Sequence, residues 1–162
     1  MDEIFHVWKI DGLQPYVPMY DARFRKAGKV LLERRRSMPG YVFIESPARG
    51  KEFYLSVNQL IRRSERSLKL LRNGVGYLDQ YFEMNASEHD ILKKLFNNER
   101  CIEMSQGFIE ETAIEVTDGP LVGLEGLIKK VDRHKMEAII EVEFMGAVRE
   151  MTVGLEIVKR LS

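Results

Sequence analysis

The residues whose types could do chemistry are few and lie far apart along the chain. The three histidines, His6, His89 and His134, have no cysteine or second histidine at the spacing of metal ligands. The single cysteine, Cys101, has no adjacent pair of basic residues, and we interpret it as an inert thiol. The sequence contains neither a glycine-rich phosphate loop nor a nucleophile elbow. We therefore predict a protein that is not an enzyme and uses no metal, cofactor or small-molecule substrate.

The charges are clustered, although 25 basic residues balance 25 acidic ones. Residues 1–103 carry 18 Lys and Arg against 14 Asp and Glu, a balance of +4, and residues 104–162 carry 7 against 11, a balance of −4. A change of sign along the chain indicates two parts with different surfaces. Basic clusters lie in residues 23–36 and 62–72. Such a cluster is often only a solvated face, but it also suits nucleic-acid phosphates or a protein-binding edge.

The first hundred residues are predicted to mix strands and helices. Pro15 and Pro18 favour an extended stretch over residues 13–20, and Gly28 marks a turn. Residues 41–44 are β-branched and aromatic and predict a strand, as residues 29–32 do more weakly. Apolar spacing predicts one helix over residues 59–72 and a second that begins at an N-cap near Ser87 and ends at residues 97–98.

The last third has the pattern of a small barrel. Five short strands separated by tight turns are expected at residues 113–116, 126–131, 138–144, 150–153 and 156–158. The predicted organisation is a first domain over residues 1–100, a linker over 101–111 and a barrel over 112–162. No apolar run approaches the roughly 20 residues of a membrane span, and the N-terminus lacks a secretory signal pattern. With a single cysteine, a cytoplasmic setting is expected.

Two motifs in this order resemble those of the NusG family. Residues 38–44 read MPGYVFI, similar to the family's FPGYVFV strand, and residues 16–18 read YVP, similar to its FVP element. Residues 117–132 read TDGPLVGLEGLIKKVD and resemble its KOW motif. A KOW motif alone also occurs in ribosomal proteins and translation factors, but these lack the first motif. Within the family, the chain is most similar to the specialised antitermination paralogs called LoaP.

The resemblance implies an α+β fold: an N-terminal antiparallel sheet with flanking helices, followed by an SH3-like five-stranded β-barrel. The family's first strand, of the type WYxxxVxxGxE, is missing from the sequence. Residues 1–11 look like the end of the first helix, or a strand formed by the alternation of Ile4, His6, Trp8 and Ile10.

The resemblance also implies a function without catalysis. The N-terminal domain would bind the clamp helices of RNA polymerase and favour the closed clamp over the paused state, which is a population shift. The Tyr41 side chain is expected to point outward. By motif position, the polymerase-binding residues are Tyr16, Met38, Pro39, Tyr41 and Phe43.

The expected nucleic-acid contacts fall into two groups. Arg34, Arg35 and Arg36 suit upstream DNA, as does the cluster at residues 62–72. In LoaP-like proteins the barrel is associated with an RNA hairpin in a leader transcript, and this role is carried to basic residues of the barrel. The alternative is a housekeeping factor whose barrel binds the ribosome or a termination factor through the loop at Met145. The barrel candidates are Lys129, Lys130, Arg133, His134, Lys135 and Arg149.

Overall fold

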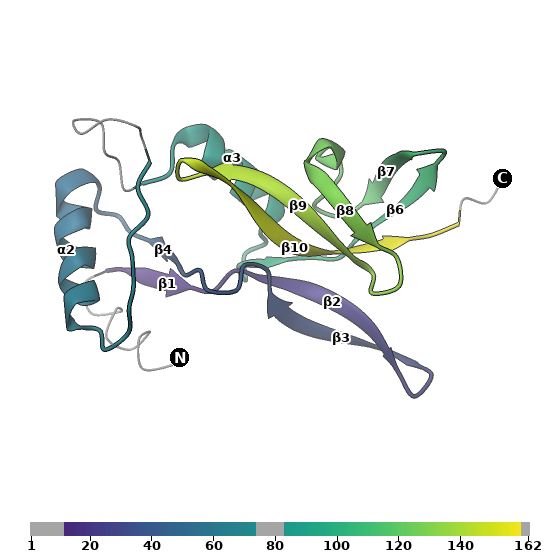
Figure 1. The fold of residues 1–162 in the computed structure, drawn as a ribbon, viewed down its shortest axis with the longest axis horizontal. Helices are drawn as coiled ribbons and strands as arrows, with labels where there is room; N and C mark the ends of the chain where they lie inside the picture. Colours follow the sequence, from purple (N-terminus) through teal and green to yellow (C-terminus); the bar gives the residue numbers. More distant parts are fainter. Residues whose placement is uncertain (1–11, 74–82, 160–162) are drawn as a thin grey trace.

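Figure 1 presents the computed structural model, which describes residues 12–73 and 83–159. This part of the chain has an α+β fold of mostly strands, with two α-helices and three sheets. The α+β class expected from the sequence is confirmed. The expectations for residues 1–11 lie outside the described residues. None of the described helices is long and apolar enough to cross a membrane.

The largest sheet has five strands and curls into a half-barrel (Figure 1). Residues alternate between buried and half-buried along most of β9, so one face of the sheet packs against a core. The strand order is β7-β6-β10-β9-β8, and β10 pairs parallel with β6 and antiparallel with β9. The strands are β6 (Ser105–Glu110), β7 (Ala113–Asp118), β8 (Ile128–Asp132), β9 (Glu137–Phe144) and β10 (Ala147–Ile157).

The five strands are not the five expected from the sequence. The two expected at residues 150–153 and 156–158 are one continuous strand, β10, which passes through Gly154 without a break. The remaining strand is β6, which lies in the range expected to be a linker. Its signal is weak because Gln106 and Gly107 interrupt the apolar pattern, and a register shift lies between them. The division of the chain into domains stays a prediction.

The N-terminal strands form two small sheets. β1 (Gln14–Tyr16) pairs with β4 (Phe43–Glu45), and β2 (Met19–Lys26) lies between β3 (Lys29–Arg36) and β5 (Cys101–Ile102). β2 and β3 form a hairpin whose turn residues, Ala27 and Gly28, have φ of 51° and 76°. Two consecutive positive φ angles are those of a type I′ turn, which glycine makes easily. The turn expected at Gly28 is confirmed.

The first helix, α2 (Gly50–Arg63), begins well before the range predicted for it. Its buried residues, Phe53, Val57 and Leu60, follow helical spacing and pack with Leu13. The helix ends where the Ser64 N–H reaches the carbonyl oxygens of Leu60 and Ile61. The predicted helix over 59–72 is confirmed for residues 59–63 and wrong for residues 64–72, where Leu68 and Leu70 pack against the α2 cluster from a non-helical segment.

The second helix, α3 (Ala86–Leu95), begins with a capping box built on Asn85 rather than Ser87. The Asn85 side chain accepts a hydrogen bond from the Glu88 N–H at 2.9 Å, and the Glu88 carboxylate accepts one from the Asn85 N–H at 2.9 Å. This reciprocal pair satisfies two otherwise unpaired N–H groups. The predicted end of the helix near residue 97 is confirmed, since Phe96 is the C-cap.

One hydrophobic core joins the N-terminal strands to the half-barrel. Tyr20, Met38 and Phe43 belong to the same buried cluster as Ile140 and Phe144 of β9. The rings of Phe43 and Phe144 meet edge to face with centroids 5.7 Å apart. The β2–β3 hairpin therefore keeps a fixed position against the half-barrel, and its far end projects away from the body (Figure 1).

Candidate nucleic-acid interface

The turn between β8 and β9 exposes three basic side chains on a fixed backbone. Asp132 Oδ1 accepts hydrogen bonds from the backbone N–H groups of His134 at 3.1 Å and Lys135 at 3.0 Å. The Lys135 N–H holds the pKa of the Asp132 carboxyl below its usual range, with the positive charge of Lys135 and the His134 N–H acting in the same direction. Arg133, His134 and Lys135 are exposed. Such a turn presents positive charge without having to order its backbone first.

Lys129 and Lys130 are neighbours on β8 with different surroundings. The ammonium group of Lys129 lies 2.7 Å from a Glu141 carboxylate oxygen and 2.9 Å from one of Glu150. Hydrogen bonds to these two carboxylates raise the pKa of Lys129. Lys130 is opposite Ile139 because of a bulge between Ile128 and Lys130, so it lies on the same face of the sheet as Lys129, but it has no ion-pair partner among the residues that the structure describes. Of the two lysines that the sequence predicted as RNA contacts, Lys129 is therefore paired with acids and Lys130 is not.

Arg149 lies at the opposite end of the sheet from the β8–β9 turn. β9 spans eight residues, about 27 Å at roughly 3.4 Å a residue, and Arg149 closes the turn after it. Its Nε donates to the Phe144 carbonyl oxygen at 3.0 Å, and its Nη2 donates to that of Met145 at 3.0 Å. Its Nη1 donates to the Tyr41 hydroxyl oxygen at 3.2 Å. Arg149 is therefore separated from the other barrel candidates at the β8–β9 turn, and its guanidinium holds the β9–β10 turn.

The arginine run on β3 is engaged within the chain. Arg34 forms ion pairs with Glu99 and Asp21. Arg35 contacts Glu33 at 3.0 Å and Glu137 at 3.2 Å. Arg36 also has an interaction with a neighbour. These acids offset most of the positive charge that the sequence suggested for this strand, so the run is a weaker nucleic-acid candidate than the β8–β9 turn.

Two of the five polymerase-binding candidates lie in the core. Met38 is 2% exposed and Phe43 is 7% exposed. In this arrangement a partner can reach neither side chain, because both belong to the buried core that the N-terminal strands share with the half-barrel. Tyr41 was expected to point outward but is half-buried, with its hydroxyl bonded to Arg149. Its phenol ring also lies 5.6 Å from the Arg149 guanidinium carbon.

The other two candidates remain at the surface. Pro39 is exposed at the turn before β4. Tyr16 is half-buried and packs edge to face on Phe43, with ring centroids 5.6 Å apart. Burial, and then the nearby Glu45 carboxylate, raise the pKa of Tyr16 to about 12. Tyr16, Pro39 and Tyr41 are thus at least partly accessible. Val42, which the sequence reasoning did not select, is 38% exposed in the same segment as Pro39 and Tyr41.

Glu88 has a role that the sequence did not reveal. Besides capping α3, its Oε2 accepts a hydrogen bond from Asn73 Nδ2 at 2.9 Å, and its Oε1 accepts one from the Met145 N–H at 3.1 Å. This buried carboxylate therefore ties the β9–β10 turn to α3. Met145 itself is 7% exposed, whereas the next residues, Gly146 and Ala147, are exposed, so the turn is at the surface without its methionine side chain. The capping pattern was visible in the sequence, but the partner from a distant turn was not.

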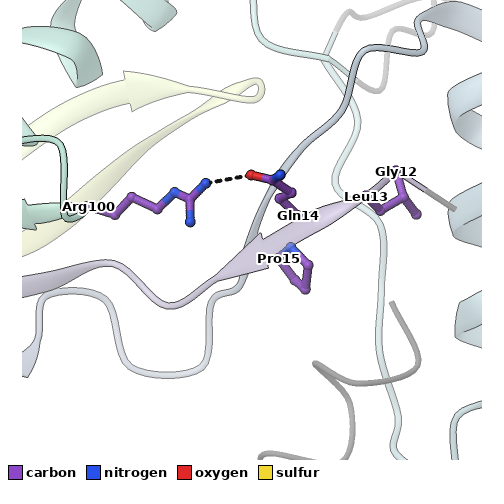
Figure 2. A pocket seen from close by; sticks show the side chains of 5 residues that line it. All are labelled: Gly12, Leu13, Gln14, Pro15 and Arg100. Atoms are coloured by element: carbon purple, nitrogen blue, oxygen red, sulfur yellow. Dashed lines mark hydrogen bonds between the residues drawn. The ribbon is translucent and has the colours of Figure 1, made fainter. Parts of the chain in front are cut away.

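Two further places in the described structure contain groups that could react, namely Cys101 and a surface pocket. The Cys101 thiol donates to Asp21 Oδ1 at 3.4 Å, and burial followed by this hydrogen bond raises the pKa of the thiol to about 12. The pocket is lined by Gly12, Leu13, Gln14, Pro15 and Arg100 (Figure 2). Arg100 points toward Gln14 there, and its charge is paired with Glu45 at 3.0 Å. Neither place gathers a nucleophile with a base.

No known protein family matches the chain, and no curated protein matches it either. The fold and the site together define an α+β protein with a curled five-stranded sheet and a projecting, preorganised basic turn. A more particular assignment has to come from the motifs and from this geometry.

Proposed function

We propose that the chain is a NusG-family transcription elongation and antitermination factor. In this proposal the β8–β9 turn binds an RNA hairpin in a nascent leader transcript, and residues around Pro39 bind RNA polymerase. Support comes from the order of the two motifs and from a curled five-stranded sheet in which the KOW-like residues 117–132 run from the end of β7 through a turn to β8. The function needs no catalytic group, because binding alone shifts the polymerase between paused and active states.

The proposal of RNA binding rests on the difference in charge between the β8–β9 turn and the rest of residues 104–162. Residues 104–162 have a balance of −4, yet Arg133 and Lys135 project from a turn whose backbone is held by Asp132. Local positive charge on a net-negative surface attracts phosphates at one place and repels them elsewhere. That arrangement favours a shaped RNA over indiscriminate binding, because phosphate contacts set the position of the nucleic acid.

The polymerase part uses the surface that remains accessible around β4. Pro39 and Val42 are exposed, and Tyr16 and Tyr41 are half-buried beside them. Met38 and Phe43 support this surface from the core instead of contacting a partner. Aromatic rings and a proline on a turn are suited to the centre of a protein interface.

A transcription assay with purified RNA polymerase tests both parts together. The full chain is the object to use, because the half-barrel shares its core with the N-terminal strands. On a template that encodes a leader hairpin followed by a terminator, the protein should increase read-through, and the Arg133→Gln/Lys135→Gln variant should lose this effect. On a template without the hairpin, both proteins should have little effect. Equal read-through on both templates would contradict the RNA part, and failure to bind polymerase would contradict the proposal as a whole.

A further inference from the structure

A second basic turn lies at the tip of the β2–β3 hairpin. Arg25, Lys26 and Lys29 surround the two-residue turn, and all three side chains are exposed. In the described part of the chain, no ion pair joins any of them to an acid. The hairpin projects from the body, so its tip is open to a large ligand (Figure 1). This differs from Arg34 and Arg35 further along the same hairpin, whose charges are offset.

Glu137, which begins β9 directly after the β8–β9 turn, joins that turn to the base of the β2–β3 hairpin. Its carboxylate accepts a hydrogen bond from the Tyr20 hydroxyl at 2.7 Å and another from Arg35 Nη1 at 3.2 Å. Tyr20 and Arg35 are opposite each other in the hairpin register. The base of the hairpin therefore lies against the end of the turn that carries Arg133 and Lys135.

The hairpin face that contacts Glu137 also leads to the second turn. Side chains two residues apart on a strand share a face, so Tyr20, Phe24 and Lys26 lie on one side of β2, together with Lys29 and Arg35 of β3. Phe24 lies between the two turns, with the Arg35 guanidinium carbon 5.4 Å from its ring centre. Along the strand, Lys26 lies about 20 Å from Tyr20 at roughly 3.4 Å a residue.

We propose that an RNA stem-loop is held by both basic turns at once, across the hairpin face between them. The inference rests on the proposed function and extends its binding site from the half-barrel to Lys26 and Lys29. The deep, narrow major groove of A-form RNA excludes side chains, so a protein holds an RNA stem mainly through phosphates and 2′-hydroxyls. Lys26 and Lys29 lie at one end of this face and the β8–β9 turn lies at the other, so cations at both ends can contact phosphates of the same stem.

The half-exposed Phe24 ring suits the loop of the same RNA, because unpaired bases stack on aromatic side chains. The base of the hairpin is held by the Glu137 contacts and by Tyr20 and Ala22 in the core, and its two strands are paired along their whole length. Little order has to be gained on binding, which favours affinity.

Salt-dependent binding of stem-loop leader RNAs to the full chain tests the inference. The hairpin variant is Lys26→Gln/Lys29→Gln. The matched control is Lys93→Gln/Lys94→Gln, which removes two exposed cations from the last turn of α3. Each lost phosphate contact lowers the slope of log affinity against log salt by about 1. The hairpin variant should therefore bind RNA more weakly, with a salt slope smaller in magnitude by about 2. The control should keep an affinity and a slope close to those of the unmodified chain.

Several outcomes separate this inference from the proposed function. The chain could bind RNA and lose binding in the Arg133→Gln/Lys135→Gln variant but not in the hairpin variant. That result would contradict the two-turn site and leave the proposed function standing. If the unmodified chain shows no preference for a stem-loop over an unpaired RNA of equal length, both are contradicted. If the hairpin variant loses affinity for duplex DNA while its binding to RNA is unchanged, the hairpin contacts DNA and the inference fails.

Discussion

Ser37 and Thr152 exchange two hydrogen bonds across the junction between the β2–β3 hairpin and the half-barrel. The Thr152 N–H donates to the Ser37 carbonyl oxygen at 2.9 Å, and the Ser37 hydroxyl donates to the Thr152 carbonyl oxygen at 2.7 Å. Ser37 is 1% exposed, so water does not compete for these groups. The end of β3 is therefore attached to the middle of β10, and the relative position of hairpin and sheet is part of the fold.

Gly154→Ala should destabilise this junction strongly. A Cβ at Gly154 would lie 2.4 Å from the Asp21 carbonyl oxygen, and a backbone atom can move only if β2 shifts away from β10. We expect a loss of about 3 kcal/mol in the free energy of unfolding, as for overpacked sites, measured by urea denaturation. Gly126→Ala is the matched control, because its added Cβ would meet nothing within 4 Å. Equal stability of both variants would show that hairpin and sheet do not meet here.

Glu88→Gln should loosen the contact between the β9–β10 turn and α3. The carboxylate accepts hydrogen bonds from Asn73, Asn85 and Met145, and an amide puts N–H groups where one oxygen now accepts. A buried donor left without its acceptor costs about 2 kcal/mol, measurable as a lower midpoint of thermal unfolding. Asp90→Asn, an exposed change on the same helix, should shift that midpoint much less. A Glu88 variant as stable as the unmodified chain would contradict the described role.

Stability should fall at alkaline pH. Burial first, and then the hydrogen bond to Glu137, raise the pKa of Tyr20 to about 12, and burial raises that of Cys101 to about 12. Between the ordinary pKa values of these groups, roughly 9 to 10, and about 12, the folded state binds protons that the unfolded state has released. The free energy of unfolding must then decrease as pH rises through this window.

Tyr20→Phe removes one of these titrating groups, so denaturation measured from pH 8 to 11 should show a shallower decline for this variant. The substitution also removes the hydrogen bond to Glu137, which lowers stability at neutral pH. The comparison therefore concerns the slope alone. An unchanged slope would mean that the Tyr20 hydroxyl titrates no differently in the two states.

Lys129 and Lys130 should differ in their effect on RNA binding although they are adjacent. Lys129 is already paired with Glu141 and Glu150, whereas Lys130 forms no ion pair in the described part of the chain. We expect Lys130→Gln to weaken RNA binding and to lower the salt slope by about 1, and Lys129→Gln to lower the slope much less. Filter-binding titrations at several salt concentrations measure both quantities. The reverse order would show that the ion pairs of Lys129 do not keep its charge from RNA.

The sequence was informative where a local pattern determines a structure. The alternation of residues 138–144 predicted β9, and Gly28 predicted the hairpin turn, because both follow from short-range geometry. The helix at Gly50–Arg63 was misplaced because Phe53 and Val57 were not recognised as part of its buried stripe. β6 was missed because Gly107 breaks its pattern, while its pairing with β10 depends on residues far along the chain.

The candidate site was predictable in its residue types but not in its pairing. The basic residues of the β8–β9 turn were visible in the sequence, and they are exposed. Nothing local showed that Glu141 and Glu150 would neutralise Lys129, or that Tyr41 would contact Arg149. These contacts join positions far apart in the chain, so only the fold reveals which charges remain available to a ligand.

The most direct measurement is salt-dependent binding of the full chain to stem-loop leader RNA, with an unpaired RNA of equal length as the competitor. We predict a preference for the stem-loop, and a slope of log affinity against log salt whose magnitude decreases by about 2 in Arg133→Gln/Lys135→Gln but not in Lys93→Gln/Lys94→Gln. Equal affinity for both RNAs, or a turn variant that binds like the unmodified chain, would contradict the claim that the β8–β9 turn reads RNA.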